Sequence, residues 1–387
     1  MAVSVASILG RAGAFSIVPN ALARGAGALH LARASLAREP APVAPSAADV
    51  IEVVGAASLL RYRSKGRALD QAPILLCPSL INRLYVLDLK EGISVVDVLL
   101  KAGHPVYGID WGEPGDSERG LSLEHFTMTR LRGFLASACA DAGVDTMTLL
   151  GHCLGGTMAT ALAAVDDTHI QSLVLLTAPL AFHDQGLLSA WTRAPFFNPR
   201  DVTKVTGHVP GWVTQPAFQI LKPMGQTSKV LRLWQNLGNP GFLDLFRCLE
   251  TWINDNVSIP DGFFHDLVEQ LYQKDALVKG TLRFDDGPVM LEDVRVPALV
   301  IAAAHDHIVP PASAIEPSRR FASAQNSLPP GRAANSSTHR CEVLDGGHIG
   351  VVVGGQARRR LWPLLLEHLA THGSAARPAP VAANAGG

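Results

Sequence analysis

The stretch TMTLLGHCLGGTMATALAA, residues 146–164, decides the fold of this 387-residue chain. Its first part is an apolar run that favours a strand, and its last part is an alanine-rich run that favours a helix. Only the six residues Gly-His-Cys-Leu-Gly-Gly separate the two runs. The sequence therefore predicts a strand that turns sharply into a helix, with Cys153 at the turn.

Cys153 occupies the serine position of the pattern G-x-S-x-G, the nucleophile elbow that joins a strand to a helix. Gly151 and Gly155 leave room for the two elements to approach the nucleophile, and Gly156 allows closer packing still. At a helix N-terminus, free N–H groups and the helix dipole favour a thiolate. The N–H of Leu154 is the natural first donor to an oxyanion. The alternative is a glycine-rich turn around a buried structural cysteine.

An elbow of this type requires an acid and then a histidine further along the chain. Asp306 comes just past an apolar run that predicts a strand. His348 lies in a glycine-flanked loop after the last predicted strand. The order of nucleophile, acid and histidine therefore holds for Cys153, Asp306 and His348, with a long interval before Asp306 that leaves room for an insertion.

Five other ionisable residues compete for these roles. Asp110 also ends a strand, but it precedes the nucleophile, which favours a structural or pocket-lining role. Asp345 is too close in sequence to the favoured histidine to be the favoured orienting acid. His305 and His307 are expected to be loop residues, and His152 is expected to shape the pocket or to tune the neighbouring cysteine.

From residue 72 onwards, short strand-like runs alternate with helical runs. This alternation predicts an α/β fold with a mostly parallel sheet covered on both faces. The strands are apolar throughout, as expected of strands that are buried on both faces. Predicted strands lie at residues 73–79, 105–111, 146–150, 172–179, 297–306 and 340–348, and predicted helices at 93–102, 123–142, 154–164 and 357–369.

The interval 181–288 breaks this alternation and holds nine of the 13 Phe and four of the six Trp. An aromatic-rich helical insertion at this place predicts a cap, or lid, over an active site. The alternative is a helical subdomain whose aromatic side chains pack only its own core. The predicted organisation is a flexible Ala/Arg-rich extension at 1–48, an α/β-hydrolase core at 49–180 and 289–370, a cap at 181–288 and a disordered tail at 371–387.

The composition excludes several classes of protein. Apolar residues make up 48% of the chain and charged residues 17%, which is typical of a globular protein with a sizeable core. The 33 basic and 34 acidic residues nearly cancel and form no basic stripe, so nucleic acid is not an expected partner. The five cysteines lack metal-binding spacing, which indicates buried thiols in a reducing cytoplasm. No run approaches the roughly 20 apolar residues of a membrane span, so we expect a soluble protein without a transmembrane segment.

Residues 1–48 are rich in alanine, with Arg11, Arg24, Arg33 and Arg38 and almost no acid. Such a segment imitates a transit peptide or forms a surface-seeking amphipathic helix. A secretory signal fits poorly because the first positive charge follows the apolar start. We expect a disordered or loosely helical extension.

The chain resembles the catalytic subunits of poly(3-hydroxyalkanoate) synthases over residues 50–369. The resemblance lies in several segments that occur in the right order, and the G-x-C-x-G-G box in company with LINR and DWG is far more specific than an elbow alone. The segments are LLRYRS, PILLCPSLINRLYVLDL, VYGIDWGEP, LLGHCLGGTMATALAA, LVLLTAPLAFHDQG, TWINDNVSIPDGFFHDLVEQLYQKDALVKG, HDHIVPP and GGHIGVVVG.

This resemblance implies an acyltransferase with an α/β-hydrolase core and a mobile cap. Its reaction would polymerise (R)-3-hydroxyacyl-CoA into a polyester with release of CoA, and it would need no cofactor or metal beyond the CoA thioester substrate. Cys153 would carry the acyl chain, His348 would be the general base and Asp306 would orient or assist it. A backbone N–H near Leu80 would be the second oxyanion donor beside that of Leu154.

The resemblance also implies a homodimer that works on the surface of polyhydroxyalkanoate granules in the cytoplasm, with hydroxyacyl-CoA and the growing polyester chain as ligands. Three features depart from the family. The length is that of the short catalytic subunits, which depend on a second synthase subunit. His152 stands where the family commonly has another residue, often an aromatic one, and residues 323–339 look like a loop insertion.

Two other functions remain open at this point. One is a thioesterase or a polyester depolymerase on the same scaffold, and the other is a granule-surface protein with little or no turnover.

Overall fold

The computed structural model describes residues 25, 28, 41–66, 69–184, 186–213, 231–322 and 339–373. The predicted N-terminal extension up to residue 40, apart from residues 25 and 28, lies outside the described residues. So do residues 374–387 of the predicted tail at 371–387 and residues 323–338 of the predicted loop insertion at 323–339, whose last residue begins β12.

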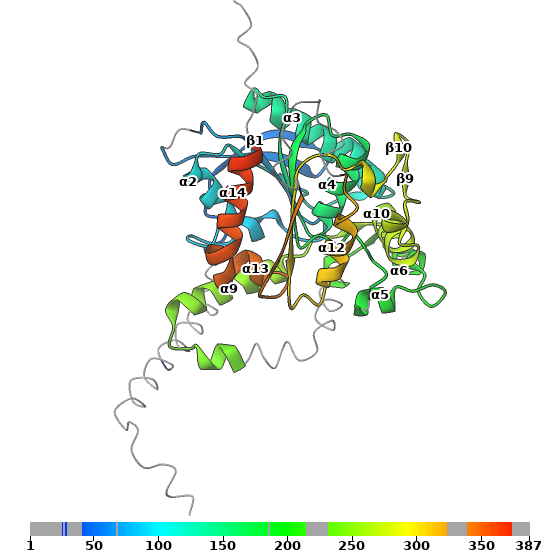
Figure 1. Ribbon diagram of the computed structural model, residues 1–387. Helices are drawn as coiled ribbons and strands as arrows, with labels where there is room; N and C mark the ends of the chain where they lie inside the picture. The colour runs from blue at the N-terminus through cyan, green and yellow to red at the C-terminus, as the bar shows by residue number, and fades with distance from the viewer. Residues whose placement is uncertain are drawn as a thin grey trace, which may run out of the picture.

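A sheet forms the centre of the molecule (Figure 1). It has eight strands in the order β1-β2-β4-β3-β5-β6-β11-β12. All six predicted strands are present, with ends that differ from the prediction by a few residues, and each pairs in parallel with its neighbours among the six. The predicted α/β fold with a mostly parallel sheet is therefore confirmed. These strands are β3 (Ile74–Cys77), β4 (Val106–Asp110), β5 (Met147–His152), β6 (Ile170–Leu176), β11 (Ala298–Ala303) and β12 (His339–Leu344).

Two further strands, β1 (Ala48–Val54) and β2 (Ala57–Tyr62), form a hairpin that was not predicted. Both pair antiparallel, and β2 joins the sheet beside β4. On the edge strand β1, Val50 and Val53 are 60% and 62% exposed. Because apolar side chains on this strand also face solvent, its sequence has no clean alternation that would mark a buried face.

Helices cover both faces of the sheet, as predicted (Figure 1). One buried apolar cluster joins the sheet to η4 (His125–Leu131), α3 (Arg132–Ala142) and α4 (Leu154–Val165). A second cluster joins the opposite face to η2 (Leu84–Asp88), α2 (Val95–Ala102), α13 (Gly350–Val353), η8 (Ala357–Leu361) and α14 (Trp362–His372). Two short helices, η3 (Asp116–Glu118) and α12 (Pro311–Ser318), complete the core.

Local sequence explains where these helices begin and end. The hydroxyl of Ser94 accepts the Asp97 N–H at 2.9 Å and caps the start of α2. Gly103 ends the same helix at φ +97°, a left-handed conformation that glycine adopts without strain.

The insertion between β6 and β11 contributes short elements beside the core, and Figure 1 shows α5, α6 and α10 together on one side and α9 below the sheet. Its buried aromatic residues Phe182 and Phe263 belong to the first core cluster, and Trp252 belongs to the second. The described part of the insertion therefore packs against the sheet as well as against itself. Its elements are α5 (Leu187–Trp191), α6 (Pro199–Thr203), β7 (His208–Val209), α9 (Pro240–Asn254), β8 (Ile259–Pro260), α10 (Asp261–Asp266), η5 (Leu267–Gln273), α11 (Ala276–Lys279), β9 (Arg283–Phe284) and β10 (Gly287–Pro288), followed by η6 (Leu291–Asp293). Within the described ranges, none of the helices is both long and apolar enough to span a bilayer.

Glycine lets α4 start almost in contact with the ends of β3 and β5. A Cβ on Gly155 would meet the carbonyl oxygens of Cys77 and Pro78, and a Cβ on Gly151 would meet the backbone of Gly156. A Cβ on Gly156 would meet the Cβ of Ala178. The strand-to-helix turn is thus closed by backbone-to-backbone contact that any larger residue would disrupt.

We expect Gly155→Ala to lower the free energy of unfolding by about 1–3 kcal/mol, because its methyl group would displace backbone atoms. Gly133→Ala is the matched control. Gly133 lies in α3 with open space around its Cβ position, so alanine should be neutral or stabilise by up to about 1 kcal/mol. Urea unfolding measures both, and equal stability of the two variants would contradict the close packing at Gly155.

Candidate active site

Cys153 stands alone between β5 and α4 in a strained backbone conformation. Its φ of +53° and ψ of −127° lie in a region that side chains of L-residues rarely adopt. The N–H of Cys153 donates to the Leu176 carbonyl at 3.0 Å, and its own carbonyl accepts the Gly156 N–H at 2.8 Å. The turn is therefore held from the neighbouring strand and from the first turn of the helix.

The Asp306 and His348 side chains meet in the interior. His348 Nδ1 donates to Asp306 Oδ2 at 2.7 Å, and the two residues are 8% and 6% exposed. The other carboxylate oxygen of Asp306 accepts the N–H groups of Ile308 and Val309, both at 2.9 Å. These bonds fix the carboxylate, and the carboxylate fixes the orientation of the imidazole ring.

The backbone joins the two loops that carry this pair. The N–H of His305 donates to the Gly346 carbonyl at 2.8 Å, and the N–H of Ala304 donates to the Leu344 carbonyl at 2.8 Å. Both loops follow neighbouring parallel strands, β11 and β12, so their side chains meet at the carboxyl edge of the sheet, where β5 also ends at the elbow.

The charge state of His348 depends on its two neighbours. Burial disfavours the imidazolium, but the negative charge of Cys153 and the hydrogen bond to Asp306 outweigh it, and a hydrogen bond to Cys153 acts in the same direction. Together they raise the pKa of His348 to about 10. The two neighbours therefore favour the protonated form of His348, which could serve as a proton donor.

His152 lies on the other side of this imidazole. Its ring centroid is 5.7 Å from that of His348, and its side chain is buried. Burial, and then the charge on His348, lower the pKa of His152 to about 3, so it stays neutral. Its Nε2 has no hydrogen-bond partner within the described ranges.

The competing acids are placed elsewhere. Asp345 contacts His305 at 3.2 Å on the surface, where both side chains are 72% exposed. Asp110 accepts the Gly112 N–H at 3.0 Å within its own turn. Of the candidate acids, Asp306 is the one that reaches His348.

The two candidate oxyanion donors belong to α4 and to the loop after β3. Leu154 is the first residue of α4, so its N–H has no partner within the helix. Leu80 is 1% exposed and lies in the loop after β3, the strand whose Cys77 pairs with Gly151 next to the nucleophile. The indole N–H of Trp111 donates to the Pro78 carbonyl at 3.1 Å and holds the start of that loop.

Comparison with known proteins agrees with the fold. The family model described as alpha/beta hydrolase fold matches residues 72–354. Poly(3-hydroxyalkanoate) polymerase subunits PhaC are similar in sequence: that of Haloferax mediterranei is 33% identical over 81% of this chain and 61% of its own length. That of Haloarcula marismortui is 30% identical over 85% of this chain and 68% of its own length. That of Allochromatium vinosum is 30% identical over 79% of this chain and 83% of its own length. The chain belongs to this polymerase family.

This chain covers 61% of the length of the Haloferax relative, which is less than two thirds. Among solved structures, a serine hydrolase from Cycloclasticus zankles is similar with a TM-score of 0.50 and 13% identity, covering 83% of this chain and 98% of that one. At that identity the likeness concerns the fold alone.

One more aromatic residue lies near Cys153 and was not predicted from the sequence. Tyr272 comes from η5 in the insertion and packs edge-to-face on Phe182 at 5.0 Å. Burial, and then the negative charge of Cys153, raise the pKa of Tyr272, so its hydroxyl keeps its proton. Its sequence context, LVEQLYQ, has only the pattern of an amphipathic helix, which gives no sign of this proximity.

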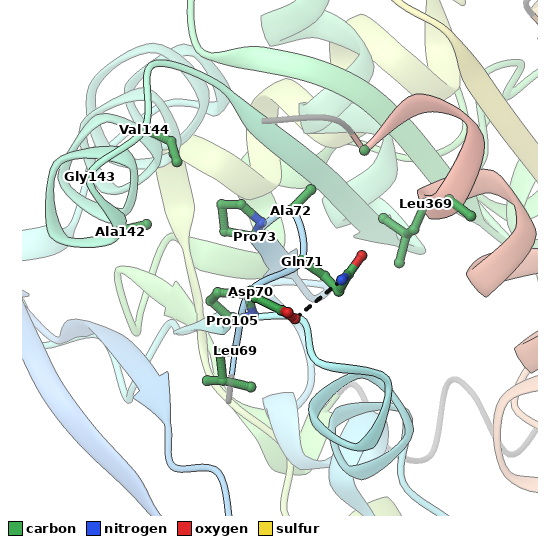
Figure 2. Close-up of a pocket in the computed structure, with 12 residues that line it drawn as sticks. Leu69, Asp70, Gln71, Ala72, Pro73, Pro105, Ala142, Gly143, Val144 and Leu369 are labelled. Carbon is green, nitrogen blue, oxygen red and sulfur yellow. Dashed lines mark hydrogen bonds between the residues drawn. The ribbon is translucent and has the colours of Figure 1, made fainter. Parts of the chain in front are cut away.

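The structure also has a cavity of about 440 Å³. Figure 2 shows the residues that line it. Pro73 and Pro105, which line it, directly precede β3 and β4, and Gly143 and Leu369 come from the ends of α3 and α14. It is therefore at the amino edge of the parallel strands, opposite the elbow, and it is not the substrate site. Over the described residues, no cluster of three or more His, Cys, Asp or Glu has an arrangement that would hold a metal ion.

We expect Cys153→Ala to lower the pKa of His348 from about 10 by about 1–3 pH units, because removal of a negative charge disfavours the imidazolium while burial still opposes it. An NMR titration of the imidazole Cε1–H measures this. Cys139→Ala, a change in α3, is the control and should leave the midpoint unchanged. The same midpoint in all three proteins would show that Cys153 does not supply the charge.

Proposed function

We propose that this protein is a polyhydroxyalkanoate synthase, an acyltransferase that polymerises (R)-3-hydroxyacyl-CoA and releases CoA. The observation that carries the proposal is the hydrogen-bonded Asp306–His348 pair beside a cysteine elbow, in a chain of the polymerase family. A serine in the elbow would suit hydrolysis, whereas cysteine suits transfer between thioesters.

In the first step, the Cys153 sulfur attacks the carbonyl carbon of the CoA thioester and a new C–S bond forms. The backbone N–H groups of Leu154 and Leu80 receive the oxyanion. The intermediate then breaks its bond to the CoA sulfur, and His348 gives its proton to this leaving group. The acyl group remains on Cys153 and His348 is neutral.

In the second step, the 3-hydroxyl of another hydroxyacyl unit attacks the acyl-cysteine. His348 now takes the hydroxyl proton as general base, while Asp306 stabilises the imidazolium that forms. An ester C–O bond forms as the C–S bond breaks, and the Cys153 thiolate is regenerated. Protons balance over the cycle, and the step uses no metal ion or cofactor.

Sulfur is the right nucleophile for this sequence of steps. Transfer from CoA to Cys153 exchanges one thioester for another at little thermodynamic cost, so the acyl group stays activated. A serine ester would already have lost that group-transfer potential. The 3-hydroxyl must still react with the acyl-cysteine faster than water does. We assign the exclusion of water to the predicted cap at 181–288, which contains Phe182 and Tyr272.

Partners and location are part of the same proposal. The relatives are named as polymerase subunits, which supports a second synthase subunit for this chain. A homodimer that works at the granule surface in the cytoplasm, with hydroxyacyl-CoA and the growing polyester chain as its ligands, fits an enzyme whose product is insoluble.

Product analysis tests the reaction. Purified protein incubated with 3-hydroxybutyryl-CoA, with and without a candidate second subunit, should release free CoA and leave insoluble polymer. Free 3-hydroxybutyrate as the only product would contradict polymerisation and indicate a thioesterase.

Substitutions test the residue roles. Cys153→Ala should abolish CoA release, and His348→Ala should reduce it by about 10³-fold or more, because such residues act as a unit. Asp306→Asn should bind substrate but turn over slowly. Cys139→Ala should match the wild type, and wild-type activity in either the Cys153 or the His348 variant would refute the assignment.

A further inference from the structure

The segment that carries Leu80, residues 78–85, comprises the loop after β3 and the first two residues of η2, and the core holds its first end. The indole N–H of Trp111 donates to the Pro78 carbonyl, and Gly155 at the start of α4 has backbone contact with the same residue. We call these eight residues the β3 loop.

The other end of the β3 loop is held by the insertion, through the residues that end and follow α9. The indole N–H of Trp252 donates to the Arg83 carbonyl at 2.9 Å, and the Val257 N–H donates to the Ile81 carbonyl at 3.3 Å. Between these bonds, Asn82 pairs with Asn256 in a short bridge, with 3.2 Å between their side-chain amides.

Asp255 lies at the centre of this contact and uses both carboxylate oxygens. Oδ1 accepts Arg83 Nε–H at 3.1 Å, and Oδ2 accepts the Tyr85 hydroxyl at 3.0 Å. Burial, together with the bond to Asp255, raises the pKa of Tyr85, so this hydroxyl remains a donor. Hydrogen bonds to a carboxylate are roughly twice as strong as neutral ones, so one side chain of the insertion fixes two side chains of the β3 loop.

We propose that Asp255 is a positioning residue, which holds the β3 loop so that the Leu80 N–H faces the oxyanion formed at Cys153. The inference rests on the proposed function, because Leu80 is a donor only in that reaction. An oxyanion donor acts only when it lies within about 2.7–3.1 Å of the oxygen. Asp255 supplies the charged bonds among the contacts that hold the second end of the loop, so without it the loop is held less tightly at such a distance.

Asp255→Ala should lower the single-turnover rate of CoA release from 3-hydroxybutyryl-CoA by about 10-fold, less than the loss of a whole oxyanion donor. The KM should change little, because the ground-state thioester has no oxyanion. Alkylation of Cys153 by iodoacetamide, followed by mass spectrometry of its peptide, should proceed at the wild-type rate because alkylation also forms no oxyanion.

Asp293→Ala is the matched control. Asp293 is as exposed as Asp255, at 43% against 41%, and it also pairs with an arginine, Arg295, at 3.2 Å. It belongs to η6, outside the β3 loop and the residues after α9, so this variant should release CoA at the wild-type rate.

Tyr85→Phe removes one hydroxyl and keeps the ring. If Asp255→Ala does not fold, this variant tests the inference instead, through its rates of CoA release and of Cys153 alkylation. The double variant should lose less than the product of the two single losses, since both changes remove the bond between Tyr85 and Asp255. CoA release at the wild-type rate in Asp255→Ala, or CoA release and alkylation that fall by the same factor, would overturn the inference. Failure of the wild type itself to release CoA would overturn the proposed function, so the two failures are distinguishable.

Discussion

The site depends on one close approach of backbones, that of α4 to the ends of β3 and β5. At this contact Gly155 lies against the carbonyl groups of Cys77 and Pro78, and Cys153 is forced to a φ of +53°. The strain is sustained because sheet and helix together over-determine the turn. It exposes a single sulfur at the edge where β11 and β12 also end, so residues far apart in sequence reach it without any long excursion of the chain.

Electrostatic pairing is the second constraint. An imidazolium buried as deeply as that of His348 would be costly unless anionic groups flank it. Asp306, itself satisfied by two backbone N–H groups, lies on one side, and Cys153 supplies the other. His152 adds no charge because burial keeps it neutral. This pairing favours the protonated form of His348, which the proposed reaction requires for its leaving group.

The sequence predicted what local patterns encode and missed what long-range contacts create. Apolar runs and glycine spacing were sufficient for the parallel strands and for the elbow, and chain order was sufficient to pick Asp306 over Asp345. The β1–β2 hairpin was missed because apolar residues of its edge strand face solvent. Tyr272 and Asp255 were missed for another reason: their significance comes from packing between the insertion and the core, and neither residue stands in a pattern that marks it.

This packing gives the insertion a second role in the proposed site besides covering it. A cap that only covered the site would keep its contacts at the rim, yet Trp252 lies in a core cluster and Asp255 bonds two side chains of the β3 loop. Water exclusion and oxyanion geometry would then depend on the same insertion, the first through Phe182 and Tyr272 and the second through Asp255. An acyl-cysteine would meet a complete set of donors only while the insertion is seated on the core, which is also when water is excluded and a 3-hydroxyl has the advantage over hydrolysis.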